Sequence, residues 1–173
     1  LRQIWANMGR KAASMGTLGA IGPSGRVDLG HTTPDPVAIH ETLAKLAREG
    51  VTHAAMEASS HGLAQYRLHG VKLAAGAFTN LTQDHLDFHF SMESYFTAKQ
   101  KLFDGSIGKR PARAVINLDD PRGAELKALC GETAMTYALD AKADITTEAR
   151  NFGLDGLRRG LRHCRRRGLS GPC

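Results

Sequence analysis

FTNLTQDHLDFHFSMESYFTAKQKLF, residues 78–103, joins the end of a predicted strand to an amphipathic helix through a polar connection. Small and apolar residues lead up to Phe78 and predict a buried strand, and Ser91 is a suitable N-cap for the helix. The connection holds more ionisable and metal-capable side chains than a loop needs: Asn80, Thr82, Asp84, His85, Asp87 and His89. Because sites are commonly built on loops held by a rigid scaffold, we expect chemistry here.

The helix after this connection carries a lysine on its apolar face. Met92, Phe96, Lys99 and Phe103 follow one another at steps of four, three and four residues, which places them on one stripe of a helix. One interpretation is that the stem of Lys99 lies on the apolar surface while its ammonium reaches water. The other is that Lys99 is held beside a site where its amine is chemically modified. The spacing leaves both interpretations open.

The flanking sequence alternates between predicted strands and helices. Strands are predicted at 51–56, 72–78, 114–117 and 135–139, with helices at 36–49, from 91 onward and up to 129. This alternation predicts an α/β fold with a mostly parallel sheet flanked by helices. Ligands of such folds bind beyond the carboxyl ends of the strands. The polar residues that fall at or just after such ends are Glu57, Asn80, His85 and Asn117.

Two threonines stand directly before the first of these helices. Asp35 can cap the helix, Pro36 suits its first position, and Gly50 ends it. Thr32 and Thr33 therefore precede a helix N-terminus, which is a natural place to hold an anionic group. The alternative is that both hydroxyls only stabilise the turn.

Composition and charge restrict the class of protein. At 173 residues, with 42% hydrophobic and 23% charged residues, the chain suits one globular domain with a core. The net charge of +6 comes from the six arginines after residue 157, without which 17 basic residues face 17 acidic ones. A nucleic-acid-binding protein would need a basic face on the folded domain. We therefore expect binding to neither nucleic acid nor membranes.

The cysteines and the start of the chain favour a cytoplasmic protein. Cys130, Cys164 and Cys173 lack the spacing of metal ligands, and few cysteines are typical of a reducing compartment. The sequence from Leu1 has no charged-then-apolar leader, so no secretory signal is expected.

Five segments, taken in order, resemble the Mur ligase family, most closely its members that add the third amino acid to UDP-N-acetylmuramoyl-L-alanyl-D-glutamate. They are HTTPDP (31–36), MEASSHGLAQYR (56–67), FTNLTQDHLDFH (78–89), YFTAKQKLF (95–103) and VINLDD (115–120). Each segment alone is weak, but five in this order and spacing are specific. The resemblance extends over about residues 1–157 and implies a P-loop-NTPase-like central domain.

The resemblance also implies an activity, namely an ATP-dependent amide ligase of peptidoglycan synthesis. ATP would phosphorylate the side-chain carboxylate of D-glutamate, and an amine of diaminopimelate or lysine would attack the acyl phosphate. Mg²⁺ would bridge phosphate and carboxylate oxygens and neutralise their repulsion. Such an enzyme serves cell-wall biogenesis, cell shape and cell division. We expect it to be monomeric.

Individual positions match functional positions of the family. Glu57 and His85 match metal ligands, and Lys99 matches a catalytic lysine that is carbamylated by CO₂ and thereby becomes a further oxygen ligand. Only the neutral amine reacts with CO₂, and a poorly solvated position on the apolar stripe favours that form. Asn117 matches a nucleotide-side position. The positions that match binders of the UDP-linked dipeptide are Thr32, Thr33, Ser59, Gln65 and Arg67.

Some features of the family are not present in this sequence. The GTNGKT-type phosphate loop is missing, so we expect residues 1–157 to be a partial central domain, inactive as a ligase by itself. After Leu157 the sequence RRGLRHCRRRGLSGPC lacks alternation and helical periodicity. We interpret residues 158–173 as an arginine-rich tail that is frameshifted or disordered.

Two hypotheses from other classes remain. One is a metal-dependent hydrolase, since clustered His and Asp side chains can ligate a metal that activates water. Its candidates would be Asp84, His85, Asp87 and His89. The other is a non-catalytic fragment that only binds ligand.

Overall fold

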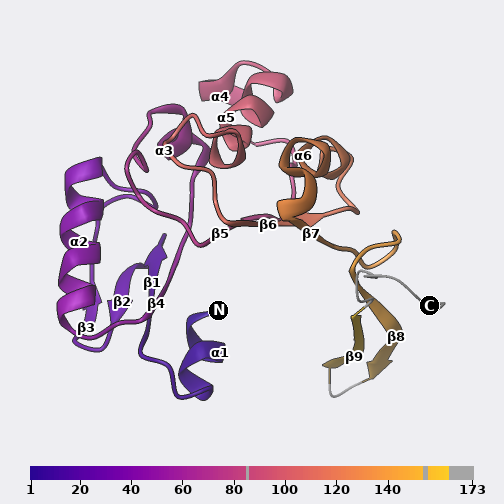
Figure 1. Cartoon of the computed structure of the whole chain (residues 1–173), viewed down its shortest axis with the longest axis horizontal. Coiled ribbons are helices and arrows are strands. Elements are labelled where there is room, and N and C mark those ends of the chain that lie inside the picture. Colours follow the sequence, from indigo (N-terminus) through magenta and orange to yellow (C-terminus); the bar gives the residue numbers. More distant parts are fainter. Residues whose placement is uncertain (85, 154–155, 164–173) are drawn as a thin grey trace. The chain divides into compact units, whose positions relative to one another are not determined.

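The computed structural model describes residues 1–84, 86–153 and 156–163. These residues form two compact units, one built from residues 1–72 and 86–109 and the other from residues 73–84, 110–153 and 156–163 (Figure 1). The alternation of strands and helices predicted a mostly parallel sheet, and each unit holds a sheet of its own. Strands and helices alternate in both, as the sequence pattern predicted.

The sheet of the first unit has the order β3-β2-β1-β4. Its strands are β1 Ala12–Gly16, β2 Gly19–Gly22, β3 Gly25–Val27 and β4 His53–Met56. β1 runs parallel to β4, with Met15 opposite Met56, and antiparallel to β2. The short β1–β2 turn depends on Gly19, whose φ is +82° and where a Cβ would lie 2.2 Å from the Val27 carbonyl oxygen.

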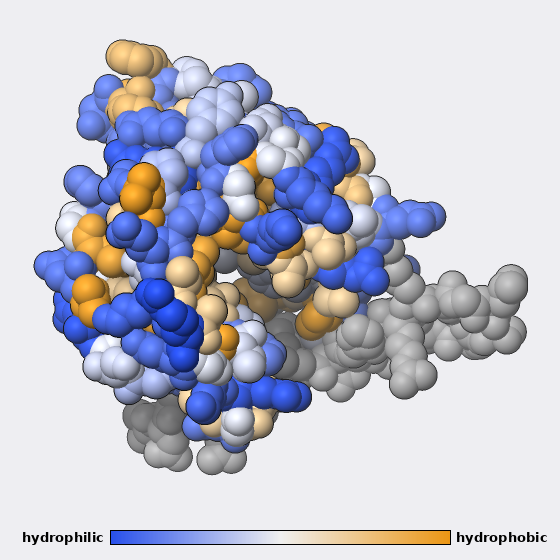
Figure 2. All heavy atoms as spheres, turned by 60° about the vertical axis from the view of Figure 1, so that its left-hand side comes forward, coloured by the Kyte–Doolittle hydropathy of each residue, from blue (hydrophilic) through white to orange (hydrophobic). Residues whose placement is uncertain are grey.

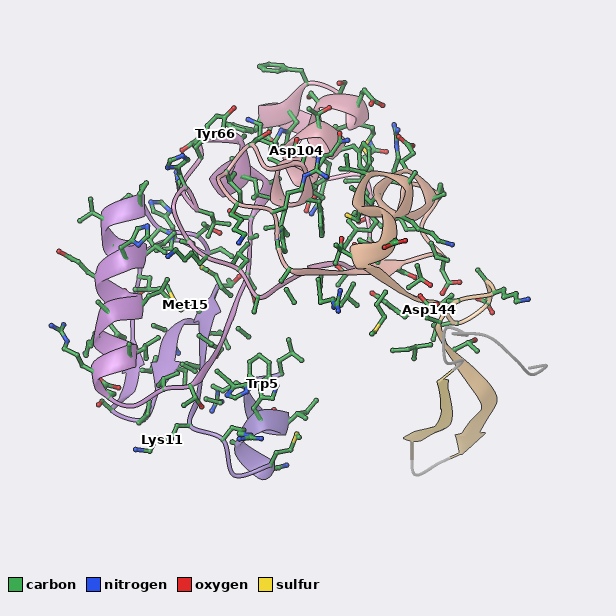
Figure 3. The ribbon with its side chains drawn as sticks, in the orientation of Figure 1. Trp5, Lys11, Met15, Tyr66, Asp104 and Asp144 are labelled. Atoms are coloured by element: carbon green, nitrogen blue, oxygen red, sulfur yellow. The ribbon has the colours of Figure 1, made fainter. Side chains whose placement is uncertain are left out.

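Two helices lie next to this sheet. The short helix α1, Arg2–Asn7, places the ring of Trp5 5.3 Å from that of His53. Helix α2, Pro36–Arg48, lies beside the sheet and buries Ile39 and Leu46 (Figure 1). Its predicted start is confirmed, because the Asp35 carboxylate accepts a hydrogen bond from the Ala38 N–H at 3.1 Å. Met15, labelled in Figure 3, lies on β1. It is 2% exposed.

Three further helices complete the first unit. They are α3 Ser60–Ala64, α4 Leu86–His89 and α5 Met92–Asp104. The predicted N-cap of α5 is confirmed, since the Ser91 hydroxyl accepts a hydrogen bond from the Ser94 N–H. Phe96 and Phe103 on the predicted apolar stripe are each 2% exposed. Helices α3 and α4 are too short to give a periodic pattern, which is why the sequence did not predict them.

The sheet of the second unit has the order β5-β6-β7-β8-β9. Its strands are β5 Ala75–Phe78, β6 Arg113–Asn117, β7 Ala134–Tyr137, β8 Ile145–Gly153 and β9 Gly156–His163. The first four are parallel in succession, as predicted, and β9 is antiparallel to β8. Helix α6, Gly123–Cys130, and the 3₁₀ turn Gly131–Thr133 connect β6 to β7. Ile116 and Leu126 are fully buried in this unit.

Strand β9 crosses the boundary that we expected at residues 157/158. It pairs with β8 as far as His163. The rest of the expected tail, residues 164–173, lies outside the described residues. No helix among the described residues has the length and apolar character needed to cross a membrane. On the face shown in Figure 2, apolar residues lie scattered among hydrophilic ones, which is normal for a protein surface.

Candidate functional site

Glu57 follows β4, at the carboxyl end of the parallel pair β1–β4, where the sequence predicted it. Its carboxylate folds back onto the turn after β1. There Glu57 Oε2 accepts one hydrogen bond from the Thr17 N–H at 3.1 Å and another from the Thr17 hydroxyl at 3.0 Å. A Cβ at Gly16 would lie 2.4 Å from Glu57 Cδ, so this position of the carboxylate requires glycine at residue 16.

Thr33 links the segment before α2 to the segment after β4. Its hydroxyl donates to the Glu57 carbonyl oxygen and accepts from the Ser59 N–H, both at 2.9 Å. The side chain is 1% exposed. The Ser59 hydroxyl accepts from the Gly62 N–H and caps α3. The polar groups of Thr33 and Ser59 therefore hold the backbone of this site in place.

Gln65 and Arg67 extend this arrangement beyond the end of α3. The Arg67 Nη1 donates to the Thr33 carbonyl oxygen at 2.8 Å, while Nε and Nη2 both donate to Gln65 Oε1. One N–H on each terminal nitrogen is left for another acceptor. Among the described residues the acceptors of the guanidinium are neutral amide and carbonyl oxygens, so no carboxylate cancels its charge there. Tyr66, between them in the sequence and labelled in Figure 3, has a φ of 56°.

Thr32 links the segment before α2 to the surroundings of the Glu57 carboxylate. Its hydroxyl oxygen lies 3.2 Å from that of Thr17, which in turn donates to Glu57. The structure thus brings Glu57 together with four of the residues expected to bind substrate, either directly or through shared neighbours. They are Thr32, Thr33, Ser59 and Arg67.

Lys99 lies partly buried on α5, as the apolar stripe predicted. Its Nζ lies 5.0 Å from the centroid of the Tyr95 ring, and that ring stacks on His89 at 4.9 Å with an interplanar angle of 18°. His89 also meets Phe88 edge-on at 4.8 Å. The ring of Tyr95 is therefore one of the neighbours of the Lys99 amine.

The residues expected for a hydrolase site do not form a metal centre in the part of the chain that is described. His89 is 5% exposed within a cluster of rings, and Asp84 and Asp87 are exposed. His85, which both the ligase and the hydrolase interpretations require, lies outside the described residues. Among the described residues no group of three His, Cys, Asp or Glu side chains is placed to hold a metal ion.

A shallow groove of about 360 Å³ opens over α3, α4 and α5. Small apolar, aromatic, hydroxyl and cationic side chains line it: Ala64, Phe88, His89, Phe90, Ser94, Thr97, Ala98 and Lys101. Lys101 Nζ lies 4.0 Å from the Tyr66 ring centroid and donates to the Ala64 carbonyl oxygen. None of the residues expected for the ligase site lines this groove in the described part of the chain.

Asn117, the residue expected on the nucleotide side, lies at the end of β6 in the second unit. Its Nδ2 donates to the Thr79 carbonyl oxygen at 2.7 Å, and its Oδ1 accepts from the Asp119 N–H at 3.0 Å. Asp120 accepts from the Leu81 N–H and the Arg122 N–H. These bonds fix the loops after β5 and β6 at the carboxyl ends of their strands.

Asp119 plays a comparable part for the loop after β7. Its carboxylate accepts hydrogen bonds from the N–H groups of residues 139, 140 and 141, at 2.5, 3.1 and 3.0 Å. Burial, and to a smaller degree the negative charge of Asp119, raise the pKa of the Tyr137 phenol. Burial likewise raises the pKa of the Cys130 thiol, an effect that the charge of Arg110 partly offsets. Nothing in the sequence pattern distinguished Asp119 from an ordinary turn residue.

Comparisons with known proteins show which family the chain is similar to. The model of the Mur ligase middle domain matches residues 1–159. The UDP-N-acetylmuramoyl-L-alanyl-D-glutamate--2,6-diaminopimelate ligase of Rhizobium meliloti (strain 1021) is 50% identical over 159 residues, which are 91% of this chain and 31% of that protein. The ligase of the same name from Agrobacterium fabrum is 51% identical over 152 residues, with 87% and 29% covered.

Solved structures extend the similarity to the fold. The structure of a UDP-N-acetylmuramoyl-L-alanyl-D-glutamate--2,6-diaminopimelate ligase superposes with a TM-score of 0.80 and 32% identity, covering 92% of this chain and 33% of the other. A structure of MurF from Acinetobacter baumannii, at 15% identity and a TM-score of 0.55, shares the fold over 73% of this chain and 28% of its own. The chain spans about a third of the length of the curated relatives it matches.

Proposed function

The chain belongs to the Mur ligase family, and from that premise we propose that it supplies the middle domain of an ATP-dependent amide ligase. The proposed reaction adds diaminopimelate to UDP-N-acetylmuramoyl-L-alanyl-D-glutamate. The names of the relatives favour diaminopimelate over lysine as the added amino acid. The observation that supports the proposal most is the cluster that joins Glu57, Thr33 and Arg67 in one unit.

The proposed chemistry joins a carboxylate to an amine in two steps. The side-chain carboxylate of D-glutamate attacks the γ-phosphorus of ATP, which forms an acyl phosphate and releases ADP. An amine of diaminopimelate then attacks the acyl carbon, which forms the amide bond and expels inorganic phosphate. The first step brings two anions together, and the second develops negative charge on the acyl oxygen and the leaving phosphate, so positively charged or hydrogen-bonding groups must stabilise that charge. When bound, Mg²⁺ supplies such charge to the phosphate and carboxylate oxygens.

Glu57 fits the part of a metal ligand. Its side chain is exposed, and among the described residues Oε1 accepts no hydrogen bond while Oε2 accepts two. A carboxylate oxygen is the ligand type that Mg²⁺ prefers. Lys99 and His85 are the other ligands that we propose, His85 on the sequence match alone.

Arg67 fits the part of an anion binder. Its guanidinium is held from two sides by neutral oxygens, so its orientation is fixed while its charge stays available. An arginine in this state can donate two charge-assisted hydrogen bonds to a carboxylate or phosphate. We assign Arg67 to an anionic group of the UDP-linked dipeptide, with Gln65 as the residue that orients it. Thr32, whose hydroxyl is partly exposed, would add a further contact.

Lys99 acts in this proposal only after it has been carbamylated. The lysine amine must lose a proton before its nitrogen attacks CO₂, and the resulting carbamate carries one negative charge and two oxygens. Lys99 lies partly buried on the apolar side of α5, and the sequence match supports its assignment as the carbamylated lysine. Asn117 would serve the nucleotide side by fixing the loop after β6. Because ATP and the UDP-linked dipeptide are made in the cytoplasm, the proposal places the reaction there.

Binding of the UDP-linked dipeptide tests this proposal. Calorimetric titration of the chain with UDP-N-acetylmuramoyl-L-alanyl-D-glutamate should show saturable binding. Arg67→Met should weaken it at least about tenfold, since a hydrogen bond to a charged group contributes about 1.5–3 kcal/mol. Arg26→Met is the matched control, because Arg26 is an exposed arginine on β3 of the same unit.

Several outcomes of this titration separate the hypotheses. Equal affinity of the wild type and Arg67→Met would contradict the assigned role of Arg67. A wild-type chain that binds UDP alone as well as the dipeptide would contradict recognition of the dipeptide. Metal-dependent release of phosphate from a substrate without ATP would favour the hydrolase instead.

A further inference from the structure

We propose that Thr17 is a positioning residue that orients the Glu57 carboxylate, so that Oε1 is the oxygen presented to a divalent cation. The inference rests on the proposed function, in which Glu57 is a metal ligand. Thr17 was not among the residues expected to act in the site. It lies in the short turn between β1 and β2, forty positions before Glu57 in the sequence.

The two oxygens of the Glu57 carboxylate have different surroundings. Oε2 accepts both the backbone N–H of Thr17 at 3.1 Å and its hydroxyl at 3.0 Å. Oε1 has no hydrogen-bond partner among the described residues. A carboxylate held at one oxygen by two donors has a defined orientation, and its other oxygen keeps its lone pairs for a cation.

The backbone around Thr17 is shaped to accept this carboxylate. A Cβ at Gly16 would lie 2.4 Å from Glu57 Cδ and 2.7 Å from both carboxylate oxygens, so any larger residue would displace the group. The Glu57 N–H donates to the Met15 carbonyl oxygen at 2.9 Å, which fixes the start of the same side chain. Hydrogen bonds at the backbone N–H and at the carboxylate therefore both hold Glu57 in place.

Hydrogen bonds connect Thr17 to Thr32, one of the residues proposed to bind substrate. The Thr17 hydroxyl has one hydrogen, which it donates to the carboxylate, because an ionised carboxylate only accepts. In the 3.2 Å contact between the two threonine hydroxyls, Thr32 must then be the donor. The chain of donors runs from Thr32 through Thr17 to Glu57, so movement of Thr32 on substrate binding would reach the metal ligand.

Hydrogen bonds of this kind are known to tune metal sites in general. Carboxylates that ligate a metal are themselves hydrogen-bonded, and removal of such a partner typically lowers metal affinity by about 10–100-fold. Thr17→Val removes the hydroxyl donor and preserves the branched shape, while the backbone N–H remains. We therefore expect a loss near the lower end of this range, about tenfold. Thr17→Ser keeps the hydroxyl and should bind metal like the wild type.

The test measures binding of Mn²⁺ to the chain by electron paramagnetic resonance, with Mg²⁺ as competitor. The variants are Thr17→Val, Thr17→Ser and Glu57→Gln. Thr52→Val is the matched control, since Thr52 is also exposed and hydrogen-bonded through its hydroxyl but precedes the opposite end of β4. Thermal unfolding of each variant reports whether the fold is retained.

The expected result is about tenfold weaker Mn²⁺ binding in Thr17→Val, wild-type binding in Thr17→Ser and Thr52→Val, and loss of binding in Glu57→Gln. If Glu57→Gln loses the metal while Thr17→Val binds it like the wild type, the inference about Thr17 is wrong and the ligand role of Glu57 stands. If Glu57→Gln and the wild type bind Mn²⁺ equally, or neither binds it, the metal role of Glu57 fails and the inference fails with it. Equal weakening by Thr17→Ser and Thr17→Val would also overturn it, because the hydroxyl would not be the cause.

Discussion

The Nζ atom of Lys99 lies 5.0 Å from the centroid of the Tyr95 ring, within the range of a cation–π interaction. This interaction stabilises the ammonium form of the lysine. The proposed carbamate is an anion, which the negative face of the ring repels. If Lys99 is carbamylated as proposed, the end of its side chain has to move away from the Tyr95 ring.

Carbamylation of Lys99 can be observed directly. The chain, equilibrated with ¹³C-labelled bicarbonate and Mg²⁺, should give a carbamate resonance in its ¹³C NMR spectrum that is lost in Lys99→Arg. Lys101→Arg is the matched control, because Lys101 lies on the same helix with its Nζ 4.0 Å from the Tyr66 ring centroid. A resonance that survives in Lys99→Arg and disappears in Lys101→Arg would show that Lys101 carries the carbamate and would contradict the assignment to Lys99.

Loss of the carbamate should reduce turnover more than substrate binding. The suitable protein is a chimeric ligase in which this chain replaces the aligned 159 residues of the Rhizobium meliloti relative. There Lys99→Ala should lower kcat by roughly a hundredfold, since removing a group that stabilises transition-state charge commonly costs about 3 kcal/mol. Acetate should restore part of the rate by supplying an oxygen ligand in the vacated space. Near-normal turnover without any response to acetate would mean that Lys99 only reaches solvent.

The backbone conformation of Phe90 is predicted to lower the free energy of unfolding. Its φ is +62° and its side chain is 90% exposed, so it has a left-handed backbone without compensating burial. The left-handed conformation costs a residue with a Cβ roughly 1–2 kcal/mol, whereas glycine adopts it freely. Phe90→Gly should therefore raise the free energy of unfolding in urea by about 1 kcal/mol.

Tyr66 provides the comparison for Phe90. It has a similar φ of 56°, but its ring lies under Lys101. Tyr66→Gly should raise the free energy of unfolding less than Phe90→Gly does, because the loss of the cation–π contact with Lys101 offsets the relief of backbone strain. A lower unfolding free energy for Phe90→Gly than for the wild type would show that its ring stabilises the fold.

The cap of α2 gives a prediction that rests on sequence and structure together. The Asp35 carboxylate accepts from the Ala38 N–H, so Asp35→Ala leaves that N–H without its partner. The free energy of unfolding should fall by about 1 kcal/mol, while Asp35→Asn, which keeps an acceptor oxygen, should change it little. If both substitutions destabilise equally, charge rather than the hydrogen bond supports the helix.

Local signals explain which parts of the fold were predictable. Helix α2 begins with a cap and a proline, and α5 begins with a serine cap and repeats apolar residues every three or four positions, so both were predicted closely. The strands β4 to β7 are short apolar runs between turn residues. The β1–β2–β3 hairpins were not predicted as such, because their register depends on glycines such as Gly19. The presence of two sheets depends on long-range contacts that no local pattern contains.

The same distinction applies to the candidate site. The position of Glu57 at a strand end and that of Lys99 on an apolar stripe were predictable from local patterns. The contact of Thr17 with Glu57 spans 40 positions, and that of Arg67 with Thr33 spans 34, so only the folded chain brings them together. The Thr33 hydroxyl is buried and makes two hydrogen bonds, which the sequence did not reveal. From the sequence alone, Thr33 could either stabilise the turn or bind an anionic group.

Amide ligation by the chimeric ligase is the most direct measurement of the proposed function. ADP formation should require UDP-N-acetylmuramoyl-L-alanyl-D-glutamate and diaminopimelate together, and should proceed within about tenfold of the Rhizobium meliloti parent, since half of the exchanged residues are identical. Cooperative thermal unfolding near that of the parent establishes that the chimera is folded. A folded chimera that binds the UDP-linked dipeptide but forms neither ADP nor tripeptide would contradict the proposal and leave this chain with a binding role only.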